Sequence, residues 1–274
     1  MNATLVLTLL LGGACVGSFI NVVAWRLPRE ESVVWPGSHC PHCGHHVRWH
    51  DNLPVLGWMI LRGRCRDCGQ PIARRYPLVE ALTAGVWLSA GWAAGLEVPN
   101  TVGLPAALTL STGVVLASLL IPLVLIDIDH LWLPESLCRA GVILGWIATG
   151  LMVASTALPK STLLHHLIAA AVGLLILEAL SAMAERLVGQ PALGLGDAKL
   201  AAVAGAWLGL SGLGMAMGIA VMTGALFGSV GRITGRLKPK EPFPFGPFIA
   251  LGIWLVWLAG PQWWWQLWLN LLQV

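Results

Sequence analysis

The sequence predicts an all-α integral membrane protein with eight transmembrane helices and one small polar insert. Of the 274 residues, 57% are hydrophobic and only 11% are charged, whereas an average soluble domain carries about 25% charged residues. The apolar residues gather in runs of about 20, the length that crosses a bilayer core of about 30 Å. This composition excludes a soluble enzyme. A net charge of +3, scattered over 16 basic and 13 acidic residues, excludes a nucleic-acid-binding surface.

The first apolar run, residues 3–25, predicts the first transmembrane helix. It has no basic residue ahead of it and has Arg26 and Arg29 behind it, the reverse of a cleavable secretory signal. We therefore expect a retained membrane anchor. The polar segment 26–76 follows, with all of the closely spaced cysteines and eight arginines. We expect the domains to be residues 1–25 (first helix), 26–76 (cytoplasmic insert) and 77–274 (a seven-helix membrane domain).

Seven more apolar runs follow the insert and complete the predicted eight helices. The sixth helix is unusually short, and the last one ends in a group of tryptophans, which prefer the membrane interface. These runs are residues 77–96, 105–126, 138–156, 164–184, 198–210, 213–231 and 245–268, and the tryptophans are Trp263, Trp264, Trp265 and Trp268.

The basic residues predict the orientation in the membrane, because cytoplasmic loops carry an excess of Lys and Arg. If the N-terminus is outside the cytoplasm and every helix reverses direction, only Lys160 lies on the outer side. Both termini are then periplasmic, and the insert is cytoplasmic. Besides the eight arginines of the insert, the cytoplasmic ends hold Arg139, Arg186, Lys199, Arg232, Arg236, Lys238 and Lys240.

The insert contains two Cys-x-x-Cys motifs, Cys40 with Cys43 and Cys65 with Cys68, separated by 21 residues. Each motif presents two sulfurs on a short turn, so four thiolates can surround one zinc ion at about 2.3 Å. Two disulfides are the alternative, but a reducing cytoplasm favours the metal. A turn at the glycine after each motif lets backbone amides point at sulfur.

We expect this zinc to be structural, because four thiolates close its coordination sphere and a catalytic zinc keeps one position open. A histidine of the insert replacing one thiolate remains an alternative. Cys15 and Cys138 lie in or beside apolar helices, and we interpret them as buried small hydrophobic residues. The chain has no His-Glu-x-x-His motif, which excludes a zinc metalloprotease. The insert histidines are His39, His42, His45, His46 and His50.

Two aspartates stand at the predicted cytoplasmic ends of helices. Asp127 follows the third apolar run, and Asp197 follows Gly194-Leu195-Gly196 at the start of the sixth. Two close carboxyl groups can share one proton, so that one activates water while the other polarises a carbonyl. A helix cap at Asp197 and a solvated helix end at Asp127 are the structural alternatives. Two such acids at one membrane face favour an aspartyl protease.

Other charged residues near these positions are not predicted to be catalytic. Asp129 should point away from Asp127 on a continuing helix. Lys199 is explained as a lysine that reaches the membrane interface, and the alternative is a role in holding a substrate carboxylate. Glu80 lies near the inner end of the second predicted helix, and Glu178 lies deeper in the fifth and has no evident partner. The roles of both residues stay open.

With these motifs in place, the sequence resembles the type IV prepilin peptidase family, bifunctional leader peptidases and N-methyltransferases of pilus and type II secretion systems. The resemblance spans nearly the whole chain. The matching blocks are Gly17–Val23 with Arg26-Leu27-Pro28, the two Cys-x-x-Cys motifs, Asp51–Pro54, Arg62–Cys65, Arg75–Glu80, Asp127–Pro134, Gly194–Asp197 with Lys199, and Pro244–Phe248.

The resemblance implies a membrane aspartyl protease with Asp127 and Asp197 as its catalytic residues. It implies a prepilin or pseudopilin substrate, cut on the cytoplasmic side after a glycine that follows a short basic leader. It also implies methylation of the new terminal amine with S-adenosylmethionine, whose binding residues the sequence does not identify. One departure is Glu135, where the family usually carries Asp or Asn.

Two other classes of function compete with this enzyme. A proton-coupled transporter would use Asp127, Asp197 and Glu178 to carry protons, but it would show inverted repeats and midplane acids, and the sequence shows neither. A zinc-bearing assembly scaffold would tolerate changes of the two aspartates. No Gly-x-Gly-x-x-Gly fingerprint supports a Rossmann-type site for the methyl donor.

Overall fold

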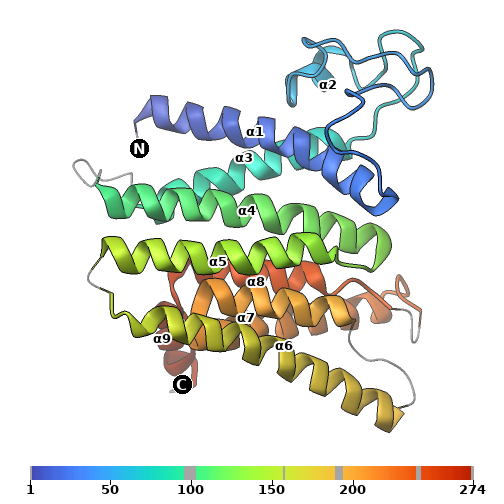
Figure 1. The fold of residues 1–274 in the computed structure, drawn as a ribbon. Coiled ribbons are helices and arrows are strands. Elements are labelled where there is room, and N and C mark those ends of the chain that lie inside the picture. The colour runs from blue at the N-terminus through green and yellow to red at the C-terminus, as the bar shows by residue number, and fades with distance from the viewer. Residues whose placement is uncertain (1, 96–102, 157, 189–193, 239–241, 273–274) are drawn as a thin grey trace. The chain divides into compact units, whose positions relative to one another are not determined.

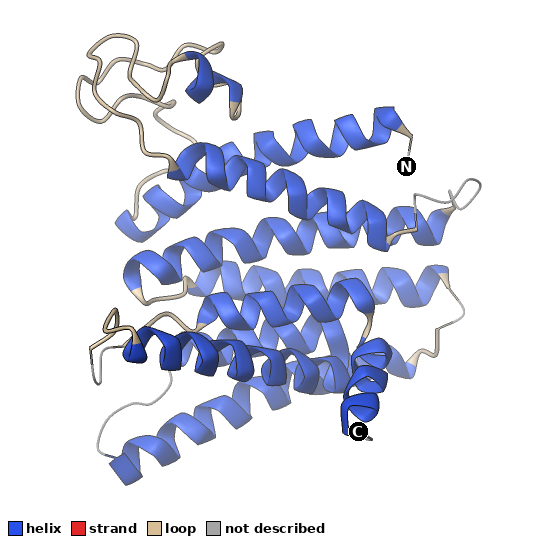
Figure 2. Ribbon diagram, turned by 180° about the vertical axis from the view of Figure 1, so that it is seen from behind, coloured by secondary structure: helices blue, strands red, loops and turns tan. Residues whose placement is uncertain are grey.

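The computed structural model of the chain describes residues 2–95, 103–156, 158–188, 194–238 and 242–272. Within these ranges every regular element is a helix and there is no strand, as the colouring of Figure 2 shows. Among the described residues, five helices are long and apolar enough to cross a membrane, and a shorter apolar helix follows them. The prediction of an all-α membrane protein is confirmed. Lys240, one of the basic residues used for the orientation, lies outside the described residues.

The chain divides into two compact units, the first of which comprises residues 1–102 and 113–122. Here α1 and α3 pack side by side (Figure 1). A Cβ atom on Gly17 would lie 2.7 Å from the Cα of Glu80, so this contact brings two backbones together, as small residues do between membrane helices. The elements of this unit are α1 (Ala3–Arg26), η1 (Leu27–Arg29), α2 (Leu56–Ile60) and α3 (Arg75–Ala93).

The second unit comprises residues 103–112 and 123–274, and α7 is its central element. α7 packs against α5, α6 and α8, and several of its alanines have no exposed surface. α4 contributes residues to both units. The helices of this part of the chain are α4 (Leu104–His130), α5 (Glu135–Ser155), α6 (Ser161–Val188), α7 (Leu195–Ile233), α8 (Gly246–Ala259) and α9 (Pro261–Leu272).

The 39 residues of α7 form two helical segments that fold back on each other at Gly209. A straight helix of this length would measure about 59 Å, roughly twice the bilayer core. Gly209 has φ 69° and ψ −174°, which no helix contains. A Cβ on Gly173 of α6 would touch both Ala201 and Leu213, which lie on opposite sides of the break. The reversal therefore agrees with the two runs 198–210 and 213–231 of the sequence.

Three expectations from the sequence need correction. The run 245–268 is not one helix, because Gly260, at φ 78°, separates α8 from α9. The insert contains a short helix, α2, which no apolar periodicity indicated. Cys15 is exposed on the surface of α1 and not buried, although Cys138 is buried as expected.

The close contact of α1 and α3 predicts opposite effects for two glycine substitutions. Gly17→Ala should lower the free energy of unfolding by about 1–3 kcal/mol, because the added methyl group forces two backbones apart. Gly85→Ala should raise it by about 0.5–1 kcal/mol, because a Cβ there meets no atom within 4 Å and helical glycine is entropically costly. Thermal unfolding of both variants in detergent measures the difference, and equal shifts would contradict the packing.

Candidate active site and metal centre

Asp127 lies in the last turn of α4, and its side chain is buried with 5% of the residue exposed. Its Oδ2 accepts a hydrogen bond of 2.9 Å from the backbone N–H of Gly246, the first residue of α8. A Cβ at position 246 would lie 2.7 Å from that oxygen. Only glycine therefore lets the backbone approach the carboxylate this closely. The sequence marked residues 244–248 as a matching block but assigned them no role.

Asp197 lies in the first turn of α7 and is also buried, with 8% of the residue exposed. Its Oδ2 accepts a hydrogen bond of 3.2 Å from the N–H of Gly194, and its own N–H donates to the carbonyl oxygen of Gly194 at 3.0 Å. Asp197 is therefore not the N-cap residue considered from the sequence, because Gly194 is the N-cap and Asp197, at the third helical position, makes the capping contact back to it. This contact uses one carboxylate oxygen and keeps the side chain at the helix N-terminus, where the helix dipole favours negative charge.

The structure brings Asp127 and Asp197 close enough for their charges to interact. Leu133, in the turn after α4, contributes to this arrangement, because its side chain packs where a Cβ on Gly196 would lie, 3.0 Å away. Neither aspartate forms an ion pair with a described lysine or arginine. Buried carboxylates normally have a cationic or metal partner, so this unpaired couple is the candidate catalytic site.

The other acidic and basic residues near this couple are engaged elsewhere or exposed. Asp129 is exposed, as the helical spacing predicted. Glu135 of α5 binds Lys199 at 3.4 Å and Arg139 at 2.5 Å. Glu135, the point of departure from the family pattern, therefore serves as the counter-charge of Lys199. Glu178 is exposed on α6 and has no hydrogen-bond partner among the described residues.

The second site is the four-cysteine cluster of the insert. The Sγ atoms of Cys40, Cys43, Cys65 and Cys68 all lie within 4.8 Å of one another, and no histidine joins this group among the described residues. The Sγ atoms of Cys40 and Cys68 are 3.8 Å apart. A tetrahedral zinc with Zn–S distances of about 2.3 Å separates its sulfurs by about 3.8 Å. The four side chains therefore fit a structural zinc ion.

The two halves of this cluster have the same backbone geometry. The N–H of Gly44 donates to the carbonyl of Cys40 and the N–H of Gly69 to that of Cys65, each at 2.9 Å, and both glycines have φ 71°. The pKa of the Cys40 thiol is lowered to about 7, because backbone N–H groups point at its sulfur. The N–H of Cys43 makes the largest contribution. The turns expected at the glycine after each motif are therefore present.

Ion pairs and one partly buried hydrogen bond hold the insert together. Arg66 binds both carboxylate oxygens of Asp51, at 2.7 and 2.5 Å, and this pairing keeps the Asp51 pKa below its usual value. Glu80 of α3 accepts a hydrogen bond of 2.6 Å from the N–H of Val55, just before α2. Glu80, whose role the sequence left open, therefore connects the insert to α3.

Comparisons with known proteins identify two matching families. Residues 11–94 match the Bacterial Peptidase A24 N-terminal domain, and residues 114–229 match the Type IV leader peptidase family. No solved structure matches the chain.

Several curated proteins are similar over most of the chain. A Prepilin leader peptidase/N-methyltransferase of Myxococcus xanthus is 40% identical, over 83% of this chain and 64% of its own length. A Type 4 prepilin-like proteins leader peptide-processing enzyme of Escherichia coli is 34% identical, over 88% of this chain and 89% of its own length. A Prepilin leader peptidase/N-methyltransferase of Burkholderia pseudomallei is 37% identical, over 88% of this chain and 81% of its own length.

The cluster predicts one zinc ion per chain that depends on all four thiolates. Replacing Cys40, Cys43, Cys65 and Cys68 together by serine should remove the metal and loosen residues 38–72, because oxygen ligands of serine do not replace thiolates. Metal analysis and limited proteolysis of the purified protein measure both effects. Cys15→Ser is the matched control and should keep one zinc. Unchanged zinc in the fourfold variant would disprove the site.

Proposed function

The chain belongs to the type IV leader peptidase family, and from this membership we propose that it is a bifunctional enzyme of the bacterial inner membrane. It removes the leader peptide from type IV prepilins or pseudopilins and then N-methylates the new N-terminal residue. The names of the similar proteins from Myxococcus and Burkholderia contain both activities. The observation that carries the peptidase activity is the buried, unpaired couple of Asp127 and Asp197.

Peptide hydrolysis follows from two carboxyl groups that share one proton. The ionised member takes a proton from a water molecule, whose oxygen then attacks the carbonyl carbon of the scissile peptide bond. The protonated member donates its proton to the carbonyl oxygen. The tetrahedral intermediate collapses when the C–N bond breaks and the leaving amine receives a proton. The N–H groups of Gly246 and Gly194 hold the two carboxylates in place and remain bonded to one oxygen of each.

We place the reaction at the cytoplasmic face of the membrane, with both termini in the periplasm. This orientation is supported by the distribution of the basic residues, of which only Lys160 falls on the outer side. A basic leader stays in the cytoplasm for the same reason, while the apolar segment that follows it enters the bilayer. The scissile bond between them then lies at the depth of the two helix ends that carry the aspartates.

The methylation step needs S-adenosylmethionine, which supplies a methyl group on a positively charged sulfur. The substrate is the amine that cleavage has just released, so one bound chain end serves both reactions without diffusing away. The four-cysteine zinc, held by Cys40, Cys43, Cys65 and Cys68, supplies a structural cross-link in the insert. The family membership does not support the alternative of a proton-coupled transporter, and an exposed Glu178 gives no buried proton path.

The peptidase proposal predicts that each aspartate is indispensable. Asp127→Asn and Asp197→Asn should each lower the rate of leader cleavage by at least about 1,000-fold. The reaction needs one carboxyl group to activate water and a second to donate a proton, and each variant keeps only one carboxyl group. The assay incubates purified enzyme in detergent with a leader-bearing pilin and separates the products by gel. Asp129→Asn, an exposed neighbour two residues away, is the matched control and should cleave normally. Normal cleavage by either dyad variant would refute the mechanism.

The methylation proposal predicts a mass change in the processed pilin. Product made with S-adenosylmethionine should be heavier by one methyl group, located on the N-terminal amine, than product made without it. Mass spectrometry of the N-terminal peptide measures this difference, and pilin with a blocked terminal amine is the control. Identical masses would reduce the function to the peptidase alone.

A further inference from the structure

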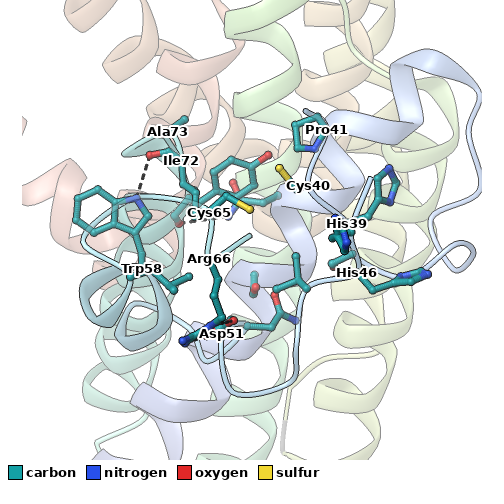
Figure 3. Close-up of a pocket in the computed structure, with 18 of the residues that line it drawn as sticks. His39, Cys40, Pro41, His46, Asp51, Trp58, Cys65, Arg66, Ile72 and Ala73 are labelled. Carbon is teal, nitrogen blue, oxygen red and sulfur yellow. Dashed lines mark hydrogen bonds and ion pairs between the residues drawn. The ribbon is translucent and has the colours of Figure 1, made fainter. Parts of the chain in front are cut away.

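The first unit contains a cavity of about 520 Å³ between the four-cysteine insert and the neighbouring ends of α1 and α3. Binding sites for small molecules commonly measure about 300–1,000 Å³. Figure 3 shows side chains from both motifs and from the segment between them gathered around this space, among them Trp58, Cys65 and the pair of Asp51 and Arg66. The dyad mechanism uses none of these residues.

Arg26, at the end of α1, places an unpaired positive charge on the wall of this cavity. The residue is only 7% exposed. Its guanidinium donates to two carbonyl oxygens, those of Ser32 at 3.0 Å and Gly37 at 3.5 Å. Among the described residues no carboxylate forms an ion pair with it. A buried cation without a counter-charge is costly, and its planar donor fork suits a carboxylate group.

Glu80 supplies a negative charge at another position on the same wall. It is also 7% exposed, and it accepts a hydrogen bond of 2.6 Å from the N–H of Val55. It forms no ion pair with a described basic residue, Arg26 included. The cavity thus presents one positive and one negative group, each buried and without a charged partner. Such a site fits a ligand that carries both a carboxylate and a cationic group.

Aromatic side chains complete the lining, since Trp25, Trp58 and Tyr76 all border the cavity. Aromatic rings bind flat heterocycles by stacking, and they attract cations through their faces. The indole N–H of Trp58 is already bonded to the carbonyl of Ile72 at 3.1 Å, which fixes the orientation of that ring.

We propose that this cavity binds the methyl donor S-adenosylmethionine, with Arg26 holding its carboxylate and Glu80 balancing its positive charge. The inference rests on the proposed methylation and adds the location of the donor site. S-adenosylmethionine contains a carboxylate that matches Arg26, two cationic groups (the ammonium and the sulfonium) that match Glu80, and a flat adenine that matches the aromatic rings. It has no phosphate, so the absence of a glycine-rich phosphate loop is expected.

A second cavity, of about 570 Å³, in the other unit fits this ligand less well. It lies among α5, α6 and α7, and its lining is mainly apolar. Both cations at its edge already have a carboxylate partner, because Glu135 binds Lys199 and Arg139. It therefore offers no unpaired positive group for a carboxylate.

Direct binding measurements test the assignment without using enzyme activity. Isothermal titration of S-adenosylmethionine into the full, zinc-loaded chain in detergent should show affinity about 10- to 100-fold weaker for Arg26→Gln, from the loss of a charge-assisted hydrogen-bond pair. Glu80→Gln should weaken binding about 10-fold, and Arg26→Lys should restore part of the loss. Arg74→Gln, an exposed arginine outside the cavity, is the matched control and should bind normally. Zinc content and the unfolding midpoint without ligand verify that each variant is folded.

Photo-crosslinking of the unaltered protein with radiolabelled S-adenosylmethionine tests the same site without any substitution. The label should map to peptides within residues 18–31 or 38–80. Label confined to residues 123–272, or unchanged affinity of Arg26→Gln, would overturn the donor site while leaving methylation intact. Failure of the unaltered protein to bind the donor at all would overturn both the site and the methylation half of the proposed function, but not leader cleavage.

Discussion

The arrangement of the second unit depends on keeping two carboxyl groups buried together without an ion pair to any described lysine or arginine. Each aspartate therefore needs a backbone N–H group, and the helices are placed to supply one. α8 begins at Gly246, where the missing side chain lets its N–H reach Asp127. α7 begins beside Gly194, whose N–H reaches Asp197. The first segment of α7 begins at the site and ends at the reversal at Gly209. Because of this reversal, the 39 residues of α7 do not have to form one straight helix longer than the bilayer core.

The first unit contains a polar segment that is too small to bury a hydrophobic core of its own. Four thiolates around one metal, the pair of Asp51 and Arg66, and the hydrogen bond from Val55 to Glu80 replace the missing hydrophobic core. The same connections enclose the cavity that we assign to the methyl donor. Zinc and donor site are therefore coupled through the folding of the insert, although the metal has no open position for chemistry.

Much of this structure follows from local patterns in the sequence, and the remainder depends on contacts between distant segments. Apolar runs predict the helices, and the Cys-x-x-Cys spacing predicts the cluster, because both are properties of short segments. The break at Gly260 was missed because apolar residues continue on both sides of it. The contact of Gly246 with Asp127 spans 119 residues, and the buried positions of Arg26 and Glu80 arise only when the insert folds onto α1 and α3.

The central claim, that residues 127 and 197 meet at one point, is tested most directly by cross-linking cysteines placed at both positions. The background would carry Cys15→Ser and Cys138→Ser, with the zinc cysteines retained, and a protease site in the loop after α6 would separate the two halves of the chain. After oxidation or treatment with a short bis-thiol reagent, the account predicts that the 127–197 pair keeps the cleaved fragments joined on a non-reducing gel and that a 129–197 pair does not. Fragments that separate for the 127–197 pair, with both thiols reactive, would contradict it.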